Sequence, residues 1–204
     1  MQENGIRINK YLSEAGVCSR READRQVELG NVSIDGKTAE TGARVLEGQT
    51  VCYCGKPVSK EREMILLAFY KPVGIVCTAE KREKNNVIDY LKYPKRIYPV
   101  GRLDKDSEGL LLMTNNGEIV NKIMRAGNRH EKEYLVTVNK PVTDSFIRGM
   151  AGGVPLVELG TQTRKCKVEK TGKRQFRIIL TQGLNRQIRR MCEYFGYRVE
   201  KLVR

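Results

Sequence analysis

Charged side chains crowd into one short stretch of this sequence, from Arg102 to Asp106, directly before an apolar run that begins at Leu110. A carboxylate in such a place can act as a nucleophile, as a base or as a stabiliser of a developing cation. Aspartate is also a common turn residue, so Asp104 has a structural explanation as well. Its surroundings must decide between the two interpretations.

Basic residues favour the chemical interpretation. Besides the cations next to Asp104, Arg186, Arg189 and Arg190 lie in a segment whose apolar residues have helical spacing. On a helical wheel Arg186 and Arg190 lie opposite the apolar stripe, whereas Arg189 lies at its boundary. A guanidinium there can reach a cleft and keep a nearby carboxylate ionised and oriented.

An aromatic residue, Tyr134, lies in the strand-like run KEYLVTV. Its ring can stack on a base extruded from a nucleic acid, and it can equally fill the core. The only histidine is His130, and the six cysteines have no zinc-ligand spacing, so we expect no metal site and no histidine-based triad. The cysteines are expected to be reduced and mostly buried.

The composition indicates a polyanionic partner. The 204 residues include 38 Lys and Arg against 24 Asp and Glu, a formal net charge of +14. Nucleic acid is the usual partner of so basic a chain. An anionic membrane surface is less favoured because no basic helix carries bulky apolar anchors, and a merely basic soluble protein is the plain alternative. No apolar run suits a membrane span or a leader, so we expect a cytoplasmic protein.

The first part of the chain reads as a small unit of two helices and a sheet. Helical spacing follows Ile8, and Ser19 with Glu22 forms a capping-box pattern for a second helix that stops at Gly30. Asp35-Gly36 predicts a tight hairpin. Five basic residues fall on or beside the helices: Arg7, Lys10, Arg20, Arg21 and Arg25.

The rest of the chain predicts a larger, strand-rich domain after a polar linker at 58–63. The apolar runs at 64–74 and 110–114 are typical of strands buried on both faces. Further strands are expected at 132–138 and 176–182, and helices at 115–128, after Thr143, and at 185–196. The predicted class is α+β, with domains at 1–57 and 64–204 and a mixed, largely antiparallel sheet in the second.

Two resemblances extend this interpretation. The stretch IRINKYLSEAGVCSRREADRQVELGNVSIDGK, from Ile6 to Lys37, resembles the S4-like RNA-binding domain. The ordered segments KPVG, GRLDKDSEGLLLMTNNG, EKEYLVTV and QGLNRQIRRM resemble the RsuA-like family of pseudouridine synthases. That resemblance covers essentially the whole chain, and GRLD together with NRQIRRM is its most specific part.

The resemblance implies a role for individual residues. Asp104 is the essential carboxylate, Tyr134 the base-stacking aromatic, and Arg189 the salt-bridge partner of Asp104 above Ile188. The remaining implied RNA contacts are Arg102, Leu103, Lys105, Asn185, Arg186 and Gln187, and the five basic residues of the S4-like module meet phosphates. Asp106 is expected to shape the turn, and Glu108 has no expected role.

The implied reaction detaches uracil from its ribose, rotates it and rejoins it through carbon. Nothing enters or leaves, so no cofactor is expected. One carboxylate can stabilise the cationic sugar, attack it, or take a proton from the neighbouring carbon, and the sequence leaves these routes open. Glycosidases need a second carboxylate to activate water, whereas an isomerising enzyme must exclude water.

The resemblance implies a uridine of 23S ribosomal RNA as the target, with a transfer RNA anticodon loop as a second candidate. A non-catalytic RNA-binding or ribosome-assembly protein is the main alternative, and a DNA-binding regulator is a weaker one. We expect a monomer without a DNA or membrane partner. Family members continue beyond the position of Arg204, so we expect a truncated chain or a short natural form; if nothing follows, an edge of the sheet would be open.

Overall fold

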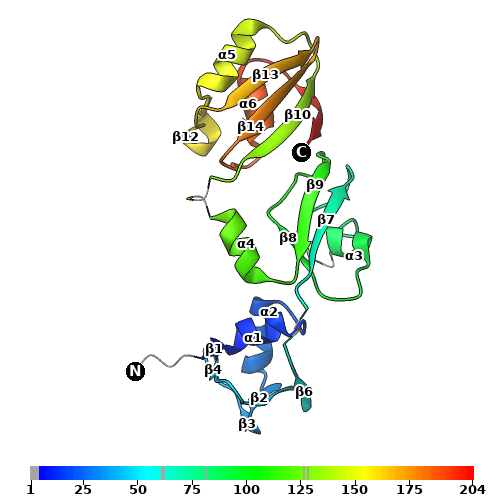
Figure 1. Ribbon diagram of the computed structural model, residues 1–204, viewed down its shortest axis with the longest axis vertical. Helices are drawn as coiled ribbons and strands as arrows, with labels where there is room; N and C mark the ends of the chain where they lie inside the picture. Colours follow the sequence, from blue (N-terminus) through cyan, green and yellow to red (C-terminus); the bar gives the residue numbers. More distant parts are fainter. Residues whose placement is uncertain (1–4, 61–62, 81, 126, 128) are drawn as a thin grey trace. The chain divides into compact units, whose positions relative to one another are not determined.

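A computed structural model describes residues 5–60, 63–80, 82–125, 127 and 129–204, which form two compact units (Figure 1). The first unit runs to residue 66 and adds residues 93–97 and 114–117, and the second contains the rest. The predicted division at 58–63 stays a proposal, and residues 61 and 62 of that linker lie outside the described residues. None of the helices in the described ranges is long and apolar enough to cross a membrane.

Two helices of the first unit form where the sequence predicts them. They are α1 (Ile8–Glu14) and α2 (Arg20–Glu28). The Ser19 hydroxyl accepts a hydrogen bond from the Glu22 N–H at 3.2 Å, which satisfies one of the free donors at the start of α2. The chain leaves α2 through Gly30, whose φ of 74° is the left-handed conformation that ends many helices.

Short strands complete the first unit. Strands β1 (Ile6–Arg7) and β4 (Arg44–Val45) pair with each other. A four-stranded sheet has the order β3-β2-β5-β6, built from β2 (Val32–Ile34), β3 (Lys37–Thr38), β5 (Val51–Tyr53) and β6 (Lys56–Val58). Positive φ at both Asp35 and Gly36 confirms the predicted hairpin between β2 and β3.

The second unit begins with a three-stranded sheet of order β7-β9-β8. Its strands are β7 (Leu66–Lys71), β8 (Tyr98–Val100) and β9 (Gly109–Thr114), accompanied by helices α3 (Val87–Leu91) and α4 (Gly117–Met124). The prediction that the first and third of these strands are buried on both faces is wrong. Tyr70 on the edge strand β7 is 59% exposed and Leu110 on β9 is 49% exposed, although Leu111 and Met113 of β9 are buried.

A second, antiparallel sheet carries the main core of this unit, with the order β13-β14-β10-β15. The strands are β10 (Lys132–Val138), β13 (Lys167–Gly172), β14 (Gln175–Leu180) and β15 (Val199–Val203). Helices α5 (Asp144–Gly152) and α6 (Gln187–Tyr194) pack on it, and β11 (Pro155–Leu156), η2 (Val157–Leu159) and β12 (Thr161–Gln162) lie between α5 and β13 in the chain. The predicted α+β class is confirmed.

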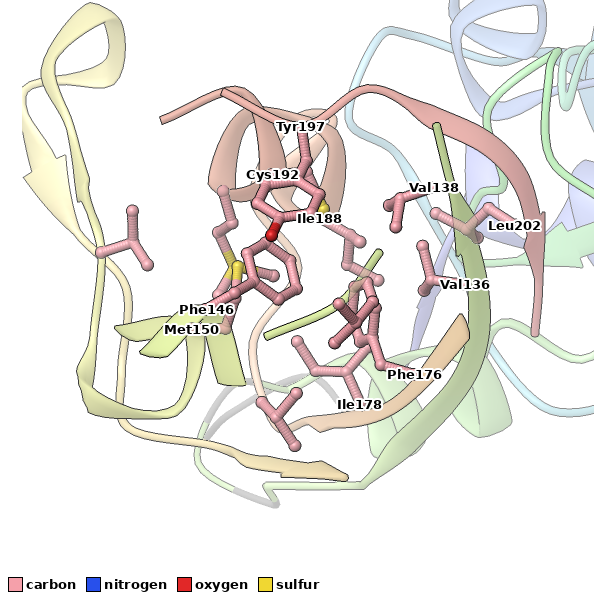
Figure 2. Packing of buried hydrophobic residues seen from close by; sticks show 14 of the residues in the cluster. Val136, Val138, Phe146, Met150, Phe176, Ile178, Ile188, Cys192, Tyr197 and Leu202 are labelled. Carbon is pink, nitrogen blue, oxygen red and sulfur yellow. The ribbon is translucent and has the colours of Figure 1, made fainter. Parts of the chain in front are cut away.

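Alternating residues of this sheet face the two helices, as Figure 2 shows. Val136 and Val138 of β10 meet Phe176 and Ile178 of β14 beneath the helices. Phe146 of α5 stacks edge-on against the Phe176 ring at 5.3 Å. Apolar burial on this scale fixes both helices on one face of the sheet, and that face also positions the site described below.

Backbone hydrogen bonds join the two sheets of the second unit. The Arg204 N–H donates to the Glu108 carbonyl, and the Arg204 carbonyl accepts from the Leu110 N–H, each at 3.0 Å. The end of the chain therefore lies beside β9 (Figure 1). Gly109 permits this approach, since a Cβ there would lie 2.3 Å from the Arg204 carbonyl oxygen. β15 remains the edge strand of its sheet, and these hydrogen bonds occupy only the end of that edge.

Candidate active site

A cleft of about 1000 Å³ in the second unit gathers most of the predicted catalytic residues. Nine of them line it: Arg102, Leu103, Asp104, Tyr134, Asn185, Arg186, Gln187, Ile188 and Arg189. Lys105 does not line the cleft, because its side chain turns outward while its carbonyl accepts a 2.8 Å hydrogen bond from Gly74. The cleft therefore brings together residues from three distant segments of the chain.

Asp104 stands at the first position of a tight turn. Its carbonyl accepts a hydrogen bond from the Ser107 N–H at 3.1 Å. Asp104 is therefore a turn residue, and this structural role is compatible with a chemical role for its side chain. The preceding Leu103 is buried, and its N–H donates to the Cys77 sulfur at 3.3 Å. A neighbouring loop thus holds the turn from both sides, and the Asp104 side chain remains 34% exposed toward the cleft.

That loop is closed by a buried lysine. Lys71 is fully buried, and its ammonium donates to the carbonyls of Pro72 and Ile75, each at 2.8 Å. Burial lowers the pKa of Lys71, while the carboxylates of the turn, Asp104 among them, oppose that shift. A buried charge persists where hydrogen bonds satisfy it, so this lysine holds the segment against which the Asp104 turn packs.

Arg189 extends from α6 to the same turn. Its guanidinium donates to the Asp106 carbonyl at 2.9 Å, to the Ser107 hydroxyl at 3.3 Å and to the Val199 carbonyl at 3.5 Å. Its Nε lies 4.0 Å from the Asp104 Oδ2. Among the described residues this buried Nε has no hydrogen-bond acceptor. The two side chains therefore form an ion pair without a hydrogen bond between Nε and the carboxylate.

The start of α6 differs from the prediction. The helix begins at Gln187, and Arg186 precedes it in a left-handed conformation with φ of 49°. Arg186 is therefore not on the helical surface that the wheel assigned to it. Its guanidinium lies 3.4 Å from the Asp106 carboxylate, so it reaches the Asp104 turn from the start of the helix.

Two of the predicted RNA contacts, Gln187 and Ile188, are buried in the protein. Gln187 is 4% exposed, and its amide oxygen accepts a hydrogen bond from the Leu184 N–H at 3.1 Å. Ile188 is buried in the main core, as Figure 2 shows. Neither side chain presents a free polar group to the cleft, whereas Asn185 next to them is exposed.

Tyr134 continues the inward row of β10 to the cleft. It packs partly against the main core, two residues before Val136. Burial raises the pKa of Tyr134, the Asp104 charge adds to that shift, and a hydrogen bond with Arg204 opposes it. Arg204 itself donates to the Leu110 carbonyl at 2.8 Å and to the Arg102 carbonyl at 3.4 Å. This arginine therefore connects the tyrosine to β9 and to the segment before Asp104.

Sequence reasoning did not assign roles to several of these residues. Lys71, Cys77, Ser107 and Arg204 each donate or accept a hydrogen bond that holds the Asp104 turn or its neighbours. The KPVG segment was the only signal among them, since a Lys-Pro pair before a turn glycine is unusual in a strand. The others become visible only when the strands are paired.

The cysteine prediction is partly wrong, because only Cys77 and Cys192 are buried and Cys54 is exposed.

The five basic residues of the S4-like module differ in their surroundings. Lys10 pairs with Glu14 at 3.5 Å, and Arg25 forms a 2.9 Å ion pair with Glu22. Three arginines are exposed and form no ion pair with another residue in the described part of the chain: Arg7, Arg20 and Arg21. Two of these three begin α2, where positive charge opposes the helix dipole, so stability alone does not explain them.

The comparison with known families now decides the relationship. The RNA pseudouridylate synthase family matches residues 65–194, which contain the whole Asp104 turn, Tyr134 and Arg189. This chain belongs to that family. The S4 domain matches residues 6–51, so an RNA-binding module precedes the synthase domain. The protein is an RNA pseudouridine synthase, and the alternative of a non-catalytic RNA-binding protein is not favoured.

Curated relatives and a solved structure agree. The chain is 58% identical to the "Dual-specificity RNA pseudouridine synthase RluF" of Salmonella typhi, over all of this chain and 71% of that protein. It is 36% identical to the "Ribosomal large subunit pseudouridine synthase B" of Bacillus subtilis, over 97% of this chain and 84% of that protein. A crystal structure of a pseudouridylate synthase superposes with a TM-score of 0.68 at 25% identity, covering 97% of this chain and 86% of that one.

Proposed function

We propose that this protein converts a uridine of large-subunit (23S) ribosomal RNA into pseudouridine, with Asp104 as its catalytic carboxylate. The observation that carries the proposal is one cleft that holds Asp104, Tyr134 and Arg189 and is also lined by Arg102, Lys132 and Arg186. The names of the relatives support the choice of RNA, since one acts on the ribosomal large subunit by its name.

The chemistry follows from the cleft. Breaking the bond between uracil and ribose makes the anomeric carbon cationic, and the Asp104 carboxylate can meet that charge directly. The Tyr134 ring gives the detached base a surface on which to stack while it turns. Leu103 and Ile188 are both buried beneath the site. Their apolar side chains disfavour water, which would otherwise capture the sugar.

Arg189 is assigned as a positioning residue for Asp104. Hydrogen bonds in an empty active site are often long and shorten when the substrate binds. The 4.0 Å separation and the missing acceptor at Nε are the pattern expected of such a pair. Arg102, Arg186 and Lys105 would meet the phosphates around the target, since each is exposed beside the turn.

The S4 domain is proposed to add affinity through phosphate contacts made by Arg7, Arg20 and Arg21, which form no ion pair within the described ranges. A transfer RNA anticodon loop is proposed as a second substrate, because the relatives at 56–58% identity are named dual-specificity enzymes. We further propose that the protein acts as a monomer in the cytoplasm.

Site mapping tests the substrate. Pseudouridine is mapped in ribosomal and transfer RNA from cells with and without the gene, and then in the unmodified RNAs after incubation with purified protein. A uridine in 23S RNA that is modified only when the protein is present supports the proposal. Unchanged maps of both RNA classes would refute it.

Replacing Asp104 tests the catalytic assignment. Asp104→Asn keeps the size and the hydrogen-bonding turn but removes the charge, so conversion should fall below detection while RNA affinity stays within about twofold. The matched control is Asp106→Asn, which removes a carboxylate from the same turn and should retain conversion. Turnover by the purified Asp104→Asn protein would contradict the assignment.

A further inference from the structure

One wall of the cleft is apolar, and its residues are outside both hydrophobic core clusters of the described residues. Helix α4 contributes Val120, Ile123 and Met124, and β9 contributes Leu110 and Leu112. We call these five residues the apolar wall. None of the residues of α4 is buried, Met124 is 47% exposed and Leu110 is 49% exposed. An apolar group of this kind, exposed and gathered in a cleft, usually marks a binding surface.

The apolar wall is continuous with the catalytic turn. The Met124 side chain lies against Gly101, where an added Cβ would be 3.1 Å from the Met124 sulfur. Gly101 begins the segment that leads to Asp104, and Leu110 follows the turn on the other side. A ligand that occupies the catalytic centre therefore extends directly onto this wall.

Size and charge indicate what kind of ligand that is. A volume of about 1000 Å³ is at the upper end of the range of about 300–1,000 Å³ that encloses a drug-sized ligand, so a single uridine does not fill it. The same cleft carries the cations Arg102, Lys132 and Arg186. A flat apolar group on an anionic chain meets both surfaces, and a nucleotide next to the target has this composition.

We propose that the apolar wall binds a nucleobase adjacent to the target uridine, which holds the RNA open while Asp104 acts. The inference rests on the proposed function, because it takes RNA as the occupant of the cleft. The cations beside the wall favour RNA over an apolar peptide or a second copy of this chain, neither of which carries the required phosphates.

The first test separates bases from phosphates. Wild type and Leu110→Ala/Met124→Ala are titrated with labelled decauridylate and with an abasic decamer that has the same phosphates. Leu135→Ala is the matched control, since Leu135 is 39% exposed on β10 and does not line the cleft. Ile123→Ala is the second variant if the double variant melts early.

The expected result is a change in the ratio of the two dissociation constants. The preference for decauridylate should fall about tenfold in the wall variant, which corresponds to about 1.4 kcal/mol, and stay constant in Leu135→Ala. An unchanged preference in both wall variants would overturn the proposal. A sedimenting dimer that the wall variant abolishes, with the preference unchanged, would assign the wall to a second copy and overturn it too.

A second test locates the base. A stem-loop with the mapped uridine is made with single abasic nucleotides at the flanking positions. For wild type, one flanking abasic position should raise KM about tenfold at constant kcat, and the wall variant should not respond to it. Equal responses of both proteins would refute the inference. If wild type converts no stem-loop while the base preference still depends on the wall, the proposed function fails and the binding site stands.

Discussion

The ion pair between Asp104 and Arg189 can be tested through folding stability as well as through turnover. The perturbation is a cycle of four proteins: wild type, Asp104→Asn, Arg189→Gln and the double variant. Both substitutions remove the charge; Asp104→Asn keeps the shape of the side chain, and Arg189→Gln shortens it. The cycle isolates the interaction between the two residues from the other contacts that each one makes.

The structure gives the expected magnitudes. Two charges 4.0 Å apart attract by about 4 kcal/mol at an effective dielectric constant of about 20. Asp104 is about one-third exposed, so solvent screening reduces the coupling to about 1 kcal/mol. Arg189→Gln also loses the hydrogen bonds that the guanidinium donates to the Asp106 carbonyl and the Ser107 hydroxyl. Removing one partner of a buried charged contact typically costs about 3–5 kcal/mol of folding free energy.

Urea unfolding followed by circular dichroism measures the free energies of unfolding of all four proteins, with conversion measured alongside. Arg189→Gln should lose about 3 kcal/mol and most activity, whereas Asp104→Asn should change stability by less than about 1 kcal/mol and lose all activity. The double variant should be more stable than additivity predicts by about 1 kcal/mol. Additive free energies, or wild-type conversion by Arg189→Gln, would refute the assigned pair.

Three further outcomes follow from the described contacts. Arg20→Ala/Arg21→Ala should reduce the salt dependence of RNA binding by about 1.4 in log Kd per log salt, if each meets one phosphate, with kcat unchanged at saturating RNA; an unchanged slope would exclude these contacts. Gly109→Ala should destabilise the protein by about 2 kcal/mol or more in urea unfolding. Gly172→Ala is the control, because an added Cβ there would lie 3.5 Å from its nearest neighbour, the Gln175 Cβ, and it should cost less than about 1 kcal/mol. Burial raises the pKa of Tyr134 above the ordinary value of 10.0, so the folded state retains this proton longer and stability should fall as the pH rises above 10; Tyr134→Phe should remove that part of the decline, and an identical pH profile would contradict it.

The helix caps and the tight hairpin were predicted from residues close together in the sequence. The Ser19 cap and the Asp35-Gly36 hairpin form as predicted, and Thr143 caps α5 through a 3.2 Å hydrogen bond from the Phe146 N–H. Such contacts join residues that are two to four positions apart, so the chain specifies them wherever it folds. The exposure of β7 and β9 was predicted wrongly because burial of a strand depends on what packs on the sheet, which apolar content does not reveal.

The residue types alone predicted the chemical character of the site: a carboxylate among cations, a tyrosine on a strand, and a basic module before them. The geometry was decided by tertiary structure alone. Arg189 reaches the Asp104 turn because α6 packs on the main sheet, and Arg204 reaches Leu110 because the end of β15 forms backbone hydrogen bonds with residues 108 and 110. Those distances depend on pairing between segments far apart in the chain, and no local pattern fixes how such segments align.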